Sequence, residues 1–157
     1  PGADKTMKRP IVGKIFKLIY PKMASISRKR DEAWKNFLQT IKENSIVGIA
    51  PEGRMMRKTG LDALGKKMYI KGGIVDIISR LNKGKILIAY SGGLHHVQHP
   101  GDFFPKIFKK LKISFEVIDL KEYKEKMFKA YEKNPILVKN RIIEDLERRK
   151  RLYTPTF

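Results

Sequence analysis

One stretch constrains the fold of this chain more than any other: the apolar run at residues 46–50, which stops at the sequence Pro-Glu-Gly-Arg. The run is short, rich in β-branched residues and bounded by turn formers, which predicts a buried strand rather than a helix. Pro51 cannot donate to a strand ladder and Gly53 tolerates a positive φ, so the strand is expected to end there in a turn. We therefore expect Glu52 and Arg54 at the end of a buried strand, where open α/β sheets bind ligands. The alternative is a surface turn that carries two charges and no ligand.

Hydrophobic periodicity predicts three elements before this stretch. Residues 11–20 form a basic amphipathic segment, expected to be a helix that packs on the core, with a helix lying on a membrane surface as the alternative. A short strand is expected over residues 24–28. Asp31 is the predicted N-cap of a helix over residues 31–44, and Trp34 lies on the apolar stripe of that helix as a core residue.

The segments after the stretch predict the fold class. A basic, glycine-bearing loop over residues 55–65 leads to a helix over residues 71–81 and a second buried strand over residues 85–91. The order strand, helix, strand is typical of a βαβ unit, so we predict an α/β fold with a largely parallel or mixed central sheet flanked by helices. Residues 113–120 alternate as a third strand, expected at the edge of this sheet.

The C-terminal part is predicted to be a helical tail. Two charged helices are expected over residues 121–133 and 135–152, the second with Pro135 at its first position. The chain is thus expected to be a single domain over residues 1–157, with a core over 11–120 and a basic tail over 121–157. It begins with Pro rather than Met, so we expect an N-terminally truncated piece of a longer protein.

The charge of the chain limits its partners. Its 157 residues include 35 Lys and Arg against 16 Asp and Glu, a formal net charge of +19. Such an excess attracts phosphate, whether on nucleic acid, on an anionic membrane or on a small substrate. The absence of cysteine excludes disulfides and thiolate metal sites. The longest apolar runs are too short to cross a bilayer, and no signal peptide is visible.

Three basic groups are candidates for binding phosphate. The first follows the turn and includes Arg54 and Arg57; the second is the cluster at residues 28–30. The third is Lys71 with Gly72, where free amides at a helix start are expected to face an anion. None of the three matches the Gly-x4-Gly-Lys-Ser/Thr phosphate loop.

These elements, in this order, resemble the lysophospholipid and glycerol-3-phosphate acyltransferases, including the 1-acyl-glycerol-3-phosphate acyltransferases. The resemblance rests on Pro-Glu-Gly-Arg, Lys-Gly-Gly and the strand at residues 86–90, and it covers residues 13–93. It implies transfer of a fatty acyl group from acyl-CoA or acyl carrier protein to a hydroxyl of a glycerol-phosphate or lysophospholipid acceptor. It also implies work at the cytoplasmic face of a membrane, with peripheral attachment or an anchor outside this chain. No cofactor besides the acyl donor is expected.

The resemblance also implies roles for residues. Glu52 and Gly53 match the family's third block, and Arg28 matches the arginine of its second block. Arg54 stands where the family has threonine, so either Arg54 or Arg57 is expected to grip the acceptor phosphate. Glu52 is expected to brace these cations rather than touch the phosphate, because two anions repel. The predicted substrate-binding set is Arg28, Glu52, Gly53, Arg54, Arg57, Lys71 and Gly72.

The catalytic base of the family is absent from this chain. The family uses the histidine of a His-x4-Asp block upstream of these elements, whereas all three histidines here follow them. We expect the block to lie in a missing N-terminal part, with His95 and His96 as the candidates within the chain. A metal site on His95, His96, His99 and Asp102 is not expected, since one short loop would supply every ligand. Phe103, Phe104, Pro105 and Phe108 nearby are expected to be core residues, with packing near the acyl chain or the membrane surface as the alternative.

The alternative function is a non-catalytic binder of anionic lipid or nucleic acid that acts through the basic surface. Specific nucleic-acid binding is not expected, because the aromatic residues do not interleave with the basic ones as a stacking platform requires, and no recognition motif is present.

Overall fold

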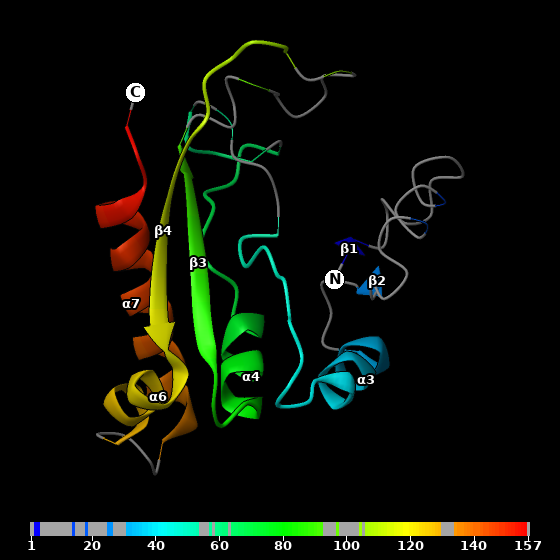
Figure 1. The fold of residues 1–157 in the computed structure, drawn as a ribbon, viewed down its shortest axis with the longest axis vertical. Coiled ribbons are helices and arrows are strands. Elements are labelled where there is room, and N and C mark those ends of the chain that lie inside the picture. Colours follow the sequence, from blue (N-terminus) through cyan, green and yellow to red (C-terminus); the bar gives the residue numbers. More distant parts are fainter. Residues whose placement is uncertain are drawn as a thin grey trace. The chain divides into compact units, whose positions relative to one another are not determined.

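The computed structural model describes residues 2–3, 14, 18, 25–26, 31–53, 57, 59–62, 64–92, 97, 104, 106–129 and 134–156. These residues form short strands, one long hairpin and a set of helices (Figure 1). In chain order the elements are β1 (Gly2–Ala3), β2 (Ser25–Ile26), α3 (Glu32–Thr40), α4 (Gly73–Arg80), β3 (Lys85–Gly92), β4 (Lys112–Asp119), α6 (Leu120–Phe128) and α7 (Pro135–Tyr153). The chain divides into two compact units, Pro1–Ile49 and Ala50–Phe157.

The first unit contains β1, β2 and α3. β1 and β2 pair in parallel over two residues each. Asp31 caps α3, because its side chain accepts a hydrogen bond from the Trp34 amide at 3.2 Å. Trp34 is buried and stacks at a tilt on Phe37, with 5.4 Å between ring centres. The predicted cap and the core position of Trp34 are confirmed, although α3 ends at Thr40 rather than at residue 44. Most of the predicted helix over residues 11–20 lies outside the described residues.

The second unit is built on the antiparallel hairpin of β3 and β4. The strands pair from Lys85 opposite Asp119 to Gly92 opposite Lys112. Figure 1 shows α7 running alongside the hairpin, α4 beside β3, and α6 at the end where β4 finishes. The hairpin and the helices enclose the core, in which Ile142 is fully buried. The buried core residues are Ile70, Val75, Ile78, Leu120, Tyr123, Met127, Val138, Ile142 and Leu146.

Side chains along the hairpin point alternately to its two faces, and one of these faces packs against the core. Ile86, Ile88 and Ile118 point to one face and pack against the core. Leu87 and Phe115 point to the other face and remain 66% and 65% exposed. Successive strand residues face opposite sides of a sheet, so the described residues cover one side of this hairpin and leave the other exposed. The prediction of a strand here is confirmed, but β3 is half-exposed rather than buried.

Side-chain caps define the C-terminal helices. Asp119 ends β4 and caps α6 by accepting from the amides of Lys121 and Glu122. Asn134 caps α7 in the same way, and Pro135 follows it at the helix start. A proline has no amide hydrogen to satisfy there, which favours a helix start at this position. The predicted pair of C-terminal helices, with Pro135 at the start of the second, is confirmed.

The predicted largely parallel or mixed central sheet flanked by helices is wrong. In the described residues the long strands pair antiparallel, and the other sheet is the two-residue pairing of β1 and β2. The physical reason lies at residues 46–50, which form no strand in the structure: Ile46 is fully exposed and Gly48 is exposed. Without a strand there, α4 does not connect two parallel strands. β3 instead finds its partner in β4, the strand that follows it.

Candidate functional site

The Pro-Glu-Gly sequence forms a turn at the start of the second unit. The Gly53 amide donates to the Ala50 carbonyl at 3.0 Å, and Gly53 has a φ of 70°. That backbone conformation favours glycine, because a Cβ would approach the following carbonyl. The predicted turn is therefore present, but it follows an extended segment rather than a strand. Glu52 lies within the turn and is partly buried.

A backbone hydrogen bond joins this turn to the start of α4. The Lys71 amide donates to the Pro51 carbonyl at 2.9 Å. The Pro-Glu-Gly sequence and the Lys-Gly-Gly sequence are thus adjacent in space, although a long loop separates them along the chain. Four members of the predicted substrate-binding set belong to the two segments that this bond connects: Glu52, Gly53, Lys71 and Gly72.

Glu52 is held by α7. Its carboxylate forms an ion pair with the Lys150 ammonium, and both side chains are about one quarter exposed. The Lys150 Nζ also lies 3.7 Å from Glu147 Oε2. Glu147 Oε1 in turn accepts from the Ile70 amide at 2.6 Å, next to the start of α4. Two carboxylates and one ammonium therefore connect the turn, α4 and α7.

Lys150 is a residue of this site that was not predicted from the sequence. Glu52 was expected to brace cations of the adjacent loop, whereas the structure supplies a cation from the C-terminal helix. A sequence signal did exist: Glu147 and Lys150 are three residues apart and lie on one side of a helix. That spacing indicates that the two side chains face the same way, but not which part of the chain they meet.

The start of α4 offers one accessible cation and a partly used set of amides. Gly72 precedes the helix without a side-chain cap. The amides of Ile74 and Val75 donate back to the carbonyls of Lys71 and Gly72, at 3.3 and 3.1 Å. The Lys71 ammonium lies 3.3 Å from the centre of the exposed Tyr69 ring, a cation–π contact. An anion at this helix start would meet the Lys71 charge first.

The remaining predicted site residues lie in the loop after the turn or outside the described part of the chain. Arg57 is exposed, and its amide donates to Leu61 at 2.8 Å within the loop that follows the turn. Asp62 belongs to the same loop, is buried, and accepts from the Leu64 and Lys66 amides, at 2.8 and 2.9 Å. The following predicted residues lie outside the described part of the chain: Arg28, Arg54, His95, His96, His99 and Asp102.

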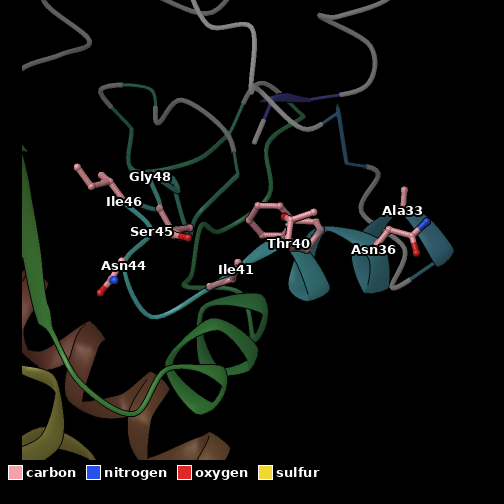
Figure 2. A pocket seen from close by; sticks show the side chains of 10 residues that line it. Ala33, Asn36, Thr40, Ile41, Asn44, Ser45, Ile46 and Gly48 are labelled. Atoms are coloured by element: carbon pink, nitrogen blue, oxygen red, sulfur yellow. The ribbon is translucent and has the colours of Figure 1, made fainter.

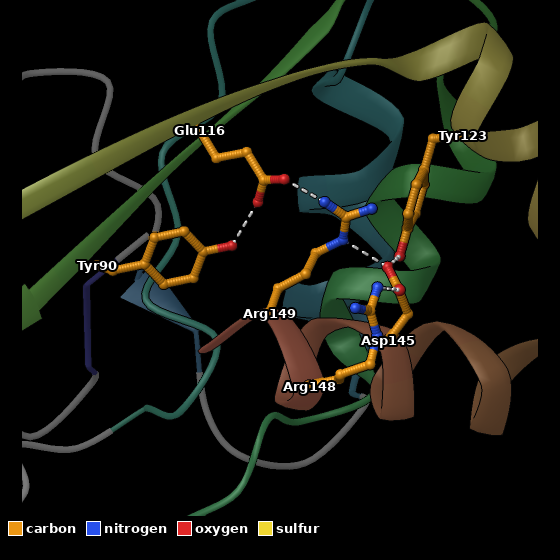
Figure 3. A network of polar contacts seen from close by, with 6 residues as sticks. All are labelled: Tyr90, Glu116, Tyr123, Asp145, Arg148 and Arg149. Carbon is orange, nitrogen blue, oxygen red and sulfur yellow. Dashed lines mark hydrogen bonds and ion pairs between the residues drawn. The ribbon is translucent and has the colours of Figure 1, made fainter. Parts of the chain in front are cut away.

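A second polar cluster lies between the hairpin and α7 (Figure 3). Arg149 forms an ion pair with Glu116 of β4 and donates through Nε to Asp145 at 2.7 Å. The Tyr90 hydroxyl donates to Glu116 at 2.7 Å. The Tyr123 hydroxyl donates to Asp145 at 3.1 Å. None of these residues was predicted from the sequence, because they come from four elements and show no motif.

The charges of this cluster compensate one another. Burial by itself would raise the pKa of Asp145, but hydrogen bonds from Arg149 and Arg148 outweigh it and hold that pKa below its usual value. Burial, followed by the hydrogen bond to Glu116, raises the pKa of Tyr90 well above its usual value. Burial and the Asp145 charge do the same for Tyr123. Both phenols thus remain neutral donors, and the cluster is suited to joining elements rather than to proton transfer at neutral pH.

The first unit carries a pocket of about 920 Å³ beside α3. Figure 2 shows side chains from α3 and from the segment after it around this hollow. Its polar lining consists of neutral groups such as Asn36, Thr40 and Asn44, and none of the described residues that line it is charged. A phosphate would find no compensating charge there, so the turn of the second unit is the better candidate site.

Comparisons with protein-family models, with curated proteins and with solved structures found no significant match to this chain. None of the helices in the described part of the chain is long and apolar enough to cross a membrane.

Proposed function

We propose that this chain binds the phosphate of a glycerol-phosphate or lysophospholipid acceptor and serves as the acceptor-binding part of an O-acyltransferase. The observation that carries the proposal is the hydrogen bond between Lys71 and Pro51, which makes the Pro-Glu-Gly and Lys-Gly-Gly sequences neighbours. Both sequences belong to the resemblance to the lysophospholipid acyltransferases.

The electrostatics of the turn support an anion there. Lys150 neutralises Glu52, so the carboxylate does not repel a nearby phosphate as a free charge would. Lys71 remains exposed at the start of α4, where the helix dipole also favours negative charge. Arg57, Lys66 and Lys67 of the following loop are exposed and add to the positive potential. Glu52 is thus a positioning residue, and Lys71 is the proposed phosphate contact.

In the proposed reaction the acceptor hydroxyl attacks the carbonyl carbon of an acyl thioester, from acyl-CoA or acyl carrier protein. A C–O bond forms, the C–S bond breaks, and the hydroxyl proton passes through a general base to the departing thiolate. We propose that this base belongs to a His-x4-Asp block outside the chain. The proposed setting is the cytoplasmic face of a membrane, because the resemblance implies that face and a lysophospholipid acceptor lies in a membrane.

Binding of glycerol-3-phosphate, followed by chemical shift changes or calorimetry, tests the acceptor site. Lys71→Gln should weaken binding by about tenfold, since charge-assisted contacts to phosphate are worth roughly 1.5–3 kcal/mol. Lys121→Gln removes an exposed lysine from α6 and is the matched control. Equal affinity of the two variants would contradict the phosphate site. The proposed acyl transfer is tested in a longer protein that carries the His-x4-Asp block. If that protein transferred no acyl group from acyl-CoA to lysophosphatidate, the proposed reaction would be contradicted.

The net charge of +19 favours a second candidate, a non-catalytic binder of anionic lipid or nucleic acid. Binding to generic DNA at low salt would not distinguish it, because any protein of this charge binds phosphate polymers. Tight binding that persists at moderate salt and discriminates between sequences would support a nucleic-acid binder.

A further inference from the structure

The turn that leads into β4 exposes apolar side chains. Ile107 and Phe108 form its tip and are 79% and 100% exposed, and Phe104 is exposed as well. The prediction that Phe104 and Phe108 are core residues is therefore wrong, while Phe103 and Pro105 lie outside the described residues. We call residues 106–111 the apolar turn. Figure 1 shows the segment that enters β4 at the opposite end of the hairpin from α6.

The backbone presents Phe108 outward rather than folding it back. Phe108 has a φ of 62°, and it is the one residue other than glycine with a positive φ in the described part of the chain. A bulky side chain rarely adopts this conformation, because its Cβ crowds the carbonyl. A backbone hydrogen bond fixes the start of the turn: the Lys106 amide donates to the Val97 carbonyl at 2.7 Å. A strained backbone that displays an aromatic ring to water indicates a use for that ring.

Lysines surround the tip. Lys106, Lys109 and Lys110 are exposed on either side of Ile107 and Phe108. The sequence has no Asp or Glu between Asp102 and Glu116, so the turn has an unbroken positive charge. Apolar residues flanked by lysines are the pattern of segments that enter the interface of anionic bilayers, where the apolar groups insert and the ammonium groups meet headgroup phosphates.

We propose that the apolar turn is a membrane-insertion site, in which Ile107 and Phe108 enter the interface of an anionic bilayer. Lys106, Lys109 and Lys110 bind the headgroup phosphates around them. A bilayer fits better than nucleic acid, because Ile107 has no aromatic face for stacking on a base. It also fits better than an acidic protein surface, because two apolar side chains protrude here and a bilayer receives them without a preformed groove.

The test is co-sedimentation of the 157-residue chain with vesicles of phosphatidylcholine, with and without phosphatidylserine. Phe108→Gly is the informative variant: it removes the apolar ring, and glycine tolerates the positive φ, so folding should not suffer. We expect binding to the phosphatidylserine vesicles to fall by about tenfold. Ile136→Ser, at an isoleucine of α7 that is 70% exposed, is the matched control and should bind as the unchanged chain does.

A charge-matched pair separates insertion from general adsorption. Lys109→Gln with Lys110→Gln should weaken vesicle binding more than Lys121→Gln with Lys126→Gln, although both pairs remove two exposed lysines. Equal losses in the two pairs, together with no effect of Phe108→Gly, would overturn the proposal in favour of adsorption by net charge. Binding of single-stranded RNA is measured for the same variants. If Phe108→Gly lost RNA binding but kept vesicle binding, the proposal would be overturned in favour of nucleic acid.

Insertion itself can be observed with Phe108→Trp. Its tryptophan emission should shift to the blue on addition of phosphatidylserine vesicles and be quenched by brominated acyl chains, beyond the signal of Trp34 in the unchanged chain. Unchanged emission would contradict insertion. No acyl donor or acceptor is present in these measurements, so they succeed or fail independently of the proposed acyl transfer.

Discussion

Arg149 is the residue on which the polar contacts between the hairpin and α7 converge. It bonds Glu116 on one side and Asp145 on the other, and its side chain is only 14% exposed. Two partly buried carboxylates lie close together here, and the Arg149 guanidinium reduces the cost of their burial because it bonds both. If Arg149 were removed, both carboxylates would lose this partner, although Asp145 would keep Arg148 and Tyr123.

We expect Arg149→Met to destabilise the protein by about 3 kcal/mol, because it leaves largely buried charge without its partner. Arg148→Met is the matched control: Arg148 also bonds Asp145, but its side chain is 52% exposed, so its loss should cost under about 1 kcal/mol. Urea unfolding of the two variants measures the difference. Similar costs for both would show that burial does not set the strength of these ion pairs.

The phenols of the cluster predict a loss of stability at alkaline pH. The folded-state pKa of Tyr123 is raised above its unfolded value of about 10, so the unfolded chain ionises first as the pH rises. The contribution of Tyr123 is therefore complete below pH 10 and declines above it, by up to about 1.4 kcal/mol per pH unit. Tyr123→Phe should show a shallower decline when unfolding is measured from pH 8 to 11. If stability fell equally with pH in Tyr123→Phe and in the unchanged protein, Tyr123 would not be the source of the alkaline loss.

At the scale of elements, the segment after α7 packs against the end of the hairpin where β3 ends and β4 begins. Lys112 Nζ donates to the Thr156 carbonyl at 2.9 Å, and the Ser114 hydroxyl donates to the Tyr153 carbonyl. The Tyr153 ring lies 5.7 Å from that of Tyr90. Gly92 permits this approach, because a Cβ there would overlap the Pro155 carbonyl oxygen.

Gly92→Ala should therefore either displace the C-terminal segment or destabilise the protein, at a cost of about 1–3 kcal/mol. Unfolding free energy and the rate of proteolysis after α7 report these two outcomes. Gly48→Ala is the control, because an added Cβ meets nothing within 4 Å there. Equal behaviour of the two alanine variants would show that the C-terminal segment does not pack at Gly92 in solution.

At the scale of the whole molecule, the second unit has a hydrophobic core drawn from its own residues. The buried cluster of the second unit draws its members from Ile70 to Leu146, within Ala50–Phe157. The turn with Glu52 and its partner Lys150 belong to the same unit. A core that draws on one unit predicts a unit able to fold by itself.

Residues 50–157 produced alone should thus unfold cooperatively and give dispersed amide resonances. The hairpin, α4, α6 and α7 supply the core without the first unit. Denaturant unfolding and a two-dimensional amide spectrum check this expectation. A collapsed chain without fixed side-chain packing would show that the first unit is required for the fold.

The sequence by itself determined the local structure of this protein. Apolar stripes at helical spacing predicted α3 and α4, and α7 was predicted as a charged helix. Asp31 and Pro135 predicted where α3 and α7 begin. Positive φ at Gly53 and the turn around it were likewise predicted. These features depend on backbone preferences and on neighbours within a few residues, which the sequence states directly.

Only the tertiary structure decided how the elements combine. The run at residues 46–50 has the composition of a buried strand, but without a partner it forms no ladder, and the hairpin pairs antiparallel instead. The partner of Glu52 likewise comes from α7, far along the chain. Strand pairing, long-range ion pairs and the exposure of Phe108 all depend on which surfaces meet in space, and local residue preferences do not encode that choice.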